Sequence, residues 1–232
     1  MGLFRESEEQ AVRDLFAKLE HAIELVLVLG PEETPMPGAR DIDFAGEAQK
    51  LVEGLAELGE LVSTRTTGEP ELGIERFPAI ALLADGDDTG IRYYGLPWGY
   101  ELSSLVGAVV EAGRPESSLH ERSLELLDGL ERDVAIEVFV TPTCPHCPPA
   151  VLMAYRAALA SPRVTAAAVE ATEFPALADA MEVYSVPAIV IDGVPRYDGA
   201  VPERVFFQRL LEYTVSESSG GVVPTRSPGQ RT

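Results

Sequence analysis

The chain has 232 residues, enough for one large domain or two small ones. Its 38 acidic residues outnumber 18 basic residues and give a formal net charge of −20, which excludes the basic surface that nucleic acids and anionic membranes require. No stretch is apolar for long enough to span a bilayer and the first residues turn acidic at once, so we expect no signal peptide and a cytoplasmic protein.

The predicted elements alternate between helices and strands. In the first half, apolar periodicity predicts helices over residues 8–21, 44–58 and 100–112, and strands over residues 23–29, 60–66, 79–83 and 91–94. In the second half it predicts helices over 118–130, 150–160, 175–181 and 202–213, and strands over 135–140, 164–170, 188–191 and 194–197. This alternation is typical of an α/β fold with a mixed sheet between helices.

The same pattern occurs twice in the chain. Residues 72–80 and 181–189 match at their apolar positions and share Pro-Ala-Ile, at Pro78 and Pro187. The turn-rich residues 113–116 are the predicted boundary between a domain of residues 1–114 and a domain of residues 115–215. The Ser/Gly/Pro-rich segment 216–232 is predicted to be a disordered tail.

The two cysteines of the chain form the motif Cys144-Pro145-His146-Cys147, directly after the apolar strand 134–140. We expect a helix to begin at about Pro145. The free N–H groups and the positive dipole at a helix start stabilise a thiolate. Cys144 is therefore the predicted attacking sulfur, and Cys147, one turn further on, is the predicted buried resolving sulfur.

The residues between and after the cysteines are expected to tune this couple. Pro145 suits the first helical position because its missing N–H has no partner there. His146 adds a donor beside the Cys144 sulfur, which favours the reduced form. Pro149 is predicted to remove a helical hydrogen bond and to bend the helix early.

Two other uses of a C-x-x-C compete with a redox site. A closed zinc site needs four ligands, but the chain has no other cysteine, and its three histidines show no ligand spacing. An inert structural disulfide is less favoured still, because closing so short a loop removes little chain entropy. A redox site beside a βαβ pattern is the stronger interpretation.

The motif after a strand, followed by Val186-Pro187 before a Gly-containing hairpin, resembles the thioredoxin superfamily. The doubled unit is similar to the two-domain protein disulfide oxidoreductases, also called glutaredoxin-like, of archaea and bacteria. This resemblance implies two tandem thioredoxin folds, each a mixed sheet flanked by helices, joined in one continuous sheet, with thiol–disulfide exchange as the activity. It also implies that Pro187 is cis and that the Val186 backbone binds an extended substrate segment.

The sequence departs from this family in two places. Many relatives carry a second C-x-x-C where this chain has Glu33-Thr34-Pro35-Met36, so the first half is predicted to be redox-silent. Thioredoxins often bury a proton-accepting acid where this chain has Val138, with Glu137 beside it. Strand alternation points these two side chains to opposite faces, so it stays open whether Glu137 reaches the sulfurs. Trp98, away from the cysteines in sequence, is interpreted as a packing anchor or cap near the domain junction.

The sequence favours a disulfide oxidoreductase that needs no cofactor beyond its Cys144–Cys147 disulfide. Its expected partners are protein or small-molecule disulfides and dithiols, and a reductase or small thiol that recycles it. One alternative is a dedicated electron carrier to a peroxiredoxin, because the N-terminal module of the flavoprotein that reduces peroxiredoxins is similar. The other is a binding module whose acidic first half holds a partner. Nucleic acid and membrane are not expected as partners.

Overall fold

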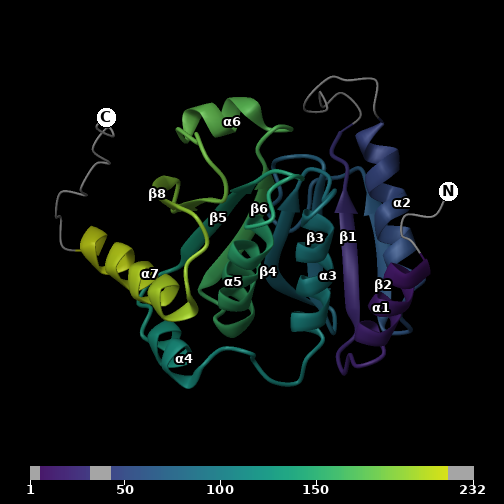
Figure 1. Ribbon diagram of the computed structural model, residues 1–232, viewed down its shortest axis with the longest axis horizontal. Coiled ribbons are helices and arrows are strands. Elements are labelled where there is room, and N and C mark those ends of the chain that lie inside the picture. Colours follow the sequence, from purple (N-terminus) through teal and green to yellow (C-terminus); the bar gives the residue numbers. More distant parts are fainter. Residues whose placement is uncertain (1–5, 32–42, 219–232) are drawn as a thin grey trace.

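The computed structural model describes residues 6–31 and 43–218, which form one eight-stranded mixed sheet with helices packed against it (Figure 1). The first half contains α1 (Glu6–Phe16), β1 (Ile23–Val28), α2 (Phe44–Ala56), β2 (Val62–Thr67), β3 (Ala79–Ala84), β4 (Asp87–Tyr94) and α3 (Glu101–Ala112). The second contains α4 (Glu121–Asp128), β5 (Val134–Val140), α5 (Cys147–Ala160), β6 (Val164–Glu170), α6 (Pro175–Ala180), β7 (Ala188–Ile191), β8 (Val194–Asp198) and α7 (Glu203–Ser218).

The strand order confirms the predicted fold class. The order is β2-β1-β3-β4-β6-β5-β7-β8, so each set of four strands has the same arrangement. In each set the first two strands are parallel and the hairpin is antiparallel. Parallel pairing of β4 with β6, with Ile91 opposite Ala166, joins the two sets into one continuous sheet. The domain boundary at residue 114 stays a prediction.

The repeat also holds at single residues in the hairpins. Asp85 and Asp192 both adopt a positive φ at a hairpin tip, and each carboxylate accepts a hydrogen bond of 2.9 Å from a backbone N–H, that of Ala22 and that of Ala135 respectively. The peptide bonds that precede Pro78 and Pro187 are both cis, as the resemblance implied for Pro187. Two hairpins with the same chemistry therefore stand at corresponding places in the two halves.

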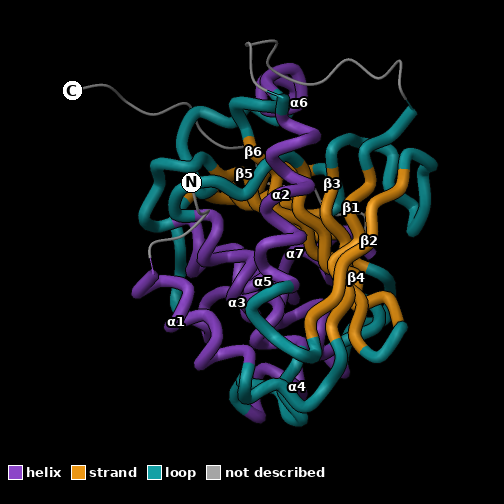
Figure 2. The backbone as a smooth tube through the Cα atoms, turned by 90° about the vertical axis from the view of Figure 1, so that its right-hand side faces the viewer, coloured by secondary structure: helices purple, strands orange, loops and turns teal. Residues whose placement is uncertain are grey.

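The sheet has an apolar core on each face. The larger core receives side chains from six helices (α1 to α5 and α7), and Figure 2 shows these helices gathered on one side of the strands. The smaller core, on the other face, is covered by α6 and by the loops around Ile74 and Phe174. Val138 and Val140 face the larger core and Phe139 the smaller one, as strand alternation requires.

Several predicted boundaries are wrong, and β4 begins at Asp87 instead of residue 91. α1 ends at Phe16 instead of residue 21, and α4 begins at Glu121 instead of residue 118. α7 continues to Ser218, three residues into the predicted tail. Residues 219–232 and the Glu33-Thr34-Pro35-Met36 segment lie outside the described residues. None of the described helices combines the length and the apolar character needed to cross a bilayer.

Candidate redox site

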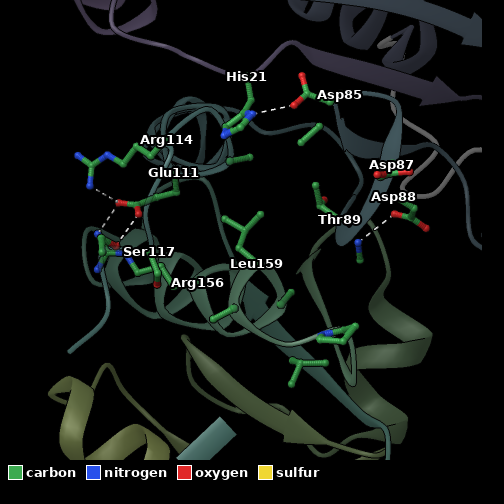
Figure 3. Close-up of a pocket in the computed structure, with 18 of the residues that line it drawn as sticks. His21, Asp85, Asp87, Asp88, Thr89, Glu111, Arg114, Ser117, Arg156 and Leu159 are labelled. Carbon is green, nitrogen blue, oxygen red and sulfur yellow. Dashed lines mark hydrogen bonds and ion pairs between the residues drawn. The ribbon is translucent and has the colours of Figure 1, made fainter. Parts of the chain in front are cut away.

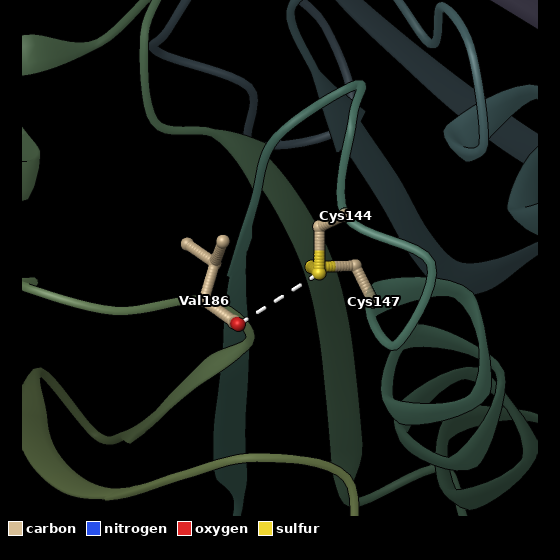
Figure 4. The surroundings of a disulfide bond; sticks show 3 residues. All are labelled: Cys144, Cys147 and Val186. Atoms are coloured by element: carbon tan, nitrogen blue, oxygen red, sulfur yellow. Dashed lines mark hydrogen bonds between the residues drawn. A yellow bond between two sulfur atoms is a disulfide. The ribbon is translucent and has the colours of Figure 1, made fainter.

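The two cysteines lie in the turn that leads from β5 into α5. The Cys144 N–H donates to the Thr141 carbonyl (3.2 Å), and the Cys147 N–H donates to the Cys144 carbonyl (3.3 Å). These contacts bring the two Cα atoms to 5.5 Å, and the sulfurs form a disulfide (Figure 4). Cys144 is 8% exposed and Cys147 is fully buried, so Cys144 is the sulfur that a substrate can reach.

The helix begins two residues later than predicted. α5 starts at Cys147, so Pro145 lies in the turn before the helix and not at its first position. Pro148 and Pro149 are the second and third helical residues, whose N–H groups would have no intrahelical partner. The predicted loss of a hydrogen bond at Pro149 is therefore wrong. His146 is solvent-exposed just before the helix, and its side chain makes no capping hydrogen bond.

Val186 lies against the accessible sulfur. The Cys144 Sγ is 3.7 Å from the Val186 carbonyl oxygen, and Figure 4 shows this oxygen pointing at the disulfide. The following residue is held in place because its carbonyl accepts a hydrogen bond of 2.7 Å from the Gly199 N–H. The structure thus brings together Cys144, Cys147, Val186 and Pro187.

Glu137 does not belong to this group. Its carboxylate is paired with the guanidinium of Arg76, which also stacks on the Tyr94 ring at 4.1 Å from the ring centroid. Glu137 follows Ile136 and precedes Val138, which both face the core that contains the cysteines, so it points to the opposite face. The tuning role considered for Glu137 is corrected to a contact between the two halves.

Three buried carboxyl groups, which sequence reasoning missed, lie where the two halves meet. Glu101 begins α3, Glu170 ends β6, and Glu173 follows in the next turn; the first two are fully buried, and Glu173 is 6% exposed. Glu173 accepts a hydrogen bond of 2.9 Å from the Leu96 N–H, across the junction. The sequence carries one signal for these buried carboxyl groups: Glu170 stands at the end of the largely apolar strand Val164–Glu170.

Burial controls the proton affinity of these groups. It raises the pKa of Glu101 to about 7, and the nearby Glu170 adds to the rise. Burial likewise raises the pKa of Glu173 to about 7, again with a contribution from Glu170. Neither carboxyl oxygen of Glu101 has a hydrogen-bond partner of ordinary geometry among the described residues. Glu101 therefore exchanges a proton near neutral pH.

Glu101 is attached to the cysteine turn through its neighbour. The Tyr100 N–H donates to the Pro142 carbonyl (2.9 Å), two residues before Cys144. Glu101 also interacts electrostatically with Tyr155 of α5, two turns beyond Cys147. The first half thus contributes a buried acid next to a residue, Tyr100, whose backbone is bonded to the cysteine turn.

A cavity of about 640 Å³ lies away from the redox site (Figure 3). It lies where α3 and α5 end, at the opposite end of α5 from Cys147. Two pairs of its side chains contact each other: His21 with Asp85 at 2.7 Å, and Glu111 with Arg156 at 2.8 Å. This cavity supplies no group to the redox site.

Comparison with known proteins identifies a thioredoxin domain in the half of the chain that contains the cysteines. A thioredoxin domain family matches residues 134–212. The F component of alkyl hydroperoxide reductase (AhpF) of Xanthomonas campestris pv. phaseoli is 31% identical over 153 residues, which are 65% of this chain and 28% of that protein. This chain therefore spans less than a third of the length of that relative.

Two solved structures match nearly the whole chain. The N-terminal domain of AhpF from Enterococcus faecalis has a TM-score of 0.79 and 30% identity, covering 89% of this chain and 99% of that one. A protein disulfide oxidoreductase from Aeropyrum pernix has a TM-score of 0.76 and 27% identity, covering 94% and 95%. With its paired folds and its disulfide at the start of α5, the chain belongs to the thioredoxin-fold oxidoreductase family, in the two-unit form seen in the N-terminal domain of AhpF.

Proposed function

We propose that this protein exchanges disulfides with protein or small-molecule thiols through Cys144 and Cys147. The observation that supports the proposal is the difference in burial of two bonded sulfurs at the start of α5, with Cys144 accessible and Cys147 enclosed. A nucleophilic sulfur must be reached by its substrate, whereas the resolving sulfur must reach only its neighbour.

In the reduced protein, the Cys144 thiolate attacks one sulfur of the substrate disulfide. The substrate S–S bond breaks, a mixed disulfide forms, and the departing substrate thiolate takes up a proton. Cys147 then gives up its proton and attacks the Cys144 sulfur. The mixed disulfide breaks, the second substrate thiolate leaves and is protonated, and the Cys144–Cys147 bond forms. Two electrons have moved to the substrate, and the reverse sequence oxidises a dithiol.

We further propose that Glu101 accepts the proton of Cys147. A fully buried thiol loses its proton to water slowly, and a carboxylate in the same interior can take it without hydration of either group. The pKa of about 7 of Glu101 suits it to both directions of transfer. Pro145 and His146 lie beside Cys144 in the turn and would influence the stability of its thiolate.

The backbone at Val186 and Pro187 is the proposed place for an extended substrate segment, because the Val186 carbonyl borders the Cys144 sulfur. The electrons are carried by the disulfide itself, so the exchange requires no metal or organic cofactor. The proposal also includes a cytoplasmic location and a reductase or small thiol that recycles the disulfide.

Single-cysteine variants test the mechanism. Cys144→Ser is expected to abolish insulin reduction, whereas Cys147→Ser is expected to accumulate a mixed disulfide with the substrate, detected by mass spectrometry. In the protein with both cysteines, Glu101→Gln is expected to slow the attack of Cys147 that resolves the mixed disulfide above pH 7. Reduction of insulin by the Cys144→Ser protein would contradict the proposal.

A second candidate is supported by the match to AhpF. In this case the protein is a dedicated electron carrier to a peroxiredoxin, and general disulfides are poor substrates. The test compares the second-order rate constants with which the reduced protein reacts with an oxidised peroxiredoxin and with insulin. A preference of a hundredfold or more for the peroxiredoxin would favour the carrier.

A further inference from the structure

The exposed aromatic side chains of the described residues lie on only two segments. Trp98 is 46% exposed, Tyr100 is 52% exposed and Tyr184 is 85% exposed. Trp98, interpreted from the sequence as a packing anchor or cap, is thus about half exposed. Large aromatic side chains in water have a free-energy cost that burial against a partner would remove.

The first segment is held against the cysteine turn by its backbone. The Tyr100 N–H donates to the Pro142 carbonyl at 2.9 Å, and Gly99 approaches the same carbonyl so closely that a Cβ would lie 2.3 Å from its oxygen. The Glu101 N–H donates to the Trp98 carbonyl at 3.1 Å. The backbone of residues 98–100 is therefore fixed while both aromatic side chains stay about half exposed.

The second segment precedes the residue that contacts the accessible sulfur. Tyr184 stands two residues before Val186, whose carbonyl lies 3.7 Å from the Cys144 sulfur. Its neighbours on both sides are anchored: the Val183 N–H donates to the Ala178 carbonyl at 2.9 Å, and the Ser185 hydroxyl donates to Asp198 at 2.5 Å. The backbone on both sides of Tyr184 is thus held in place, while the Tyr184 ring is exposed.

We propose that Trp98, Tyr100 and Tyr184 form an aromatic surface that docks the polypeptide segment next to a substrate disulfide. The half without cysteines would then recognise the protein that the other half reduces. This inference rests on the proposed exchange at Cys144, and it makes proteins the substrate class.

The charge near this surface indicates the chemistry of the occupant. Asp179 and Glu182, close to Tyr184 in the chain, are exposed, and the whole chain carries a net charge of −20. Aromatic rings bind apolar side chains and also attract arginine and lysine through their faces. The segment that fits is therefore apolar and basic, and an acidic segment would be repelled.

The test uses two disulfide-closed peptides of equal length, one with Leu and Arg beside its cysteines and one with Ser and Asp. Each is mixed with the reduced full chain, and the second-order rate constant of oxidation is divided by that for 2-hydroxyethyl disulfide. The wild type is expected to prefer the Leu/Arg peptide about tenfold. The triple variant Trp98→Ala/Tyr100→Ala/Tyr184→Ala is expected to lose this preference.

Leu61→Ala is the control, because Leu61 is an exposed apolar side chain (39%) at the β2 edge of the sheet, away from the disulfide. It should keep the preference. If the triple variant does not fold, Tyr184→Ser alone must still reduce the preference at least threefold. Equal rates for both peptides in the wild type would overturn the docking surface, as would a preference that survives the triple substitution. The docking surface would also be overturned if the wild type is a dimer and the triple variant is a monomer, because the surface would then bind a second copy of the chain. No reaction with 2-hydroxyethyl disulfide would instead contradict the exchange itself.

Discussion

At the residue scale, the two sulfurs differ in access and in position relative to the helix. Cys147 is inside α5 and fully buried, whereas Cys144 precedes the helix and keeps 8% of its surface exposed. After reduction, we expect iodoacetamide at pH 6 to alkylate Cys144 at least tenfold faster than Cys147, because only an accessible thiolate reacts. Peptide mapping after short labelling measures the ratio. Equal labelling of the two cysteines in the folded protein would contradict the assignment.

Glu101 makes the stability of the protein depend on pH. Its folded-state pKa is about 7, above the ordinary value of 4.5, so the folded protein holds its proton more tightly than the unfolded chain does. The contribution to stability is complete below about pH 4.5 and is lost as the pH rises through 7. A difference of this size corresponds to about 3 kcal/mol. The carboxyl groups with lowered pKa values, such as Asp88 and Glu111, stay ionised above pH 5 and do not oppose this trend.

The measurement is the free energy of unfolding by urea at pH 5 and at pH 8. The wild type is expected to lose stability between them, and Glu101→Gln should lose markedly less, because the amide does not titrate. Glu182→Gln changes an exposed glutamate and serves as the control. An unchanged pH dependence in Glu101→Gln would show that Glu101 is ionised in the folded protein.

At the element scale, Gly99 determines how closely α3 approaches the cysteine turn. Its φ is +59°, and an added Cβ would lie 2.3 Å from the Pro142 oxygen. Gly73 has a similar φ of +68° with no atom within 4 Å of such a Cβ, so Gly73→Ala reports the backbone cost alone. That cost is about 1 kcal/mol. We expect Gly99→Ala to destabilise the protein by about 2 kcal/mol more than Gly73→Ala, as measured by urea unfolding. If Gly99→Ala and Gly73→Ala destabilise the protein equally, the cysteine turn can move away from residue 99 without a free-energy cost.

The elements show what the sequence could predict and what it could not. The repeat predicted the paired arrangement of strands, because residues 72–80 and 181–189 form the same turn before the same hairpin. The predicted start of α5 is two residues early, since proline is tolerated both in a turn and at the first three helical positions. Local patterns could not identify Glu101 as the proposed proton acceptor, because it lies 43 residues before Cys144 in the chain and is linked to the cysteine turn through the packing of α3 and the Tyr100–Pro142 hydrogen bond.

The redox pair was predictable for a physical reason, and the surface around it was not. A C-x-x-C brings its two sulfurs together within a single helical turn, so its chemistry is readable from local sequence. Trp98 and Tyr184 are 86 residues apart, and nothing in either segment alone indicates that both adjoin the turn of Cys144. Strand alternation alone leaves the role of Glu137 open, because the residue that pairs with its carboxylate, Arg76, lies in the other half of the chain.

At the scale of the whole molecule, the two halves share one sheet and several buried contacts. β4 pairs with β6, the buried hydroxyl of Tyr155 donates to the Arg92 carbonyl at 2.8 Å, and Arg156 pairs with Glu111. Separating the halves would expose the β4–β6 backbone and exchange these hydrogen bonds for bonds to water, at a net cost of about 0.5–1.5 kcal/mol for each bond. The halves should therefore unfold together.

Urea unfolding followed by two probes tests this cooperativity. Trp98 is the only tryptophan of the chain and reports on the first half, while the accessibility of the reduced cysteines to a thiol reagent reports on the second. We expect coincident transitions for the wild type. Tyr155→Phe removes one junction hydrogen bond and should destabilise the protein by about 1 kcal/mol, lowering both midpoints together. Ser103→Ala, which removes a hydroxyl that bonds the Tyr100 carbonyl within the first half, is the control and should not separate the probes. If the tryptophan and cysteine transitions separate in the wild type, the halves are independent folding units, and a substrate held on the first half could not be presented rigidly to Cys144.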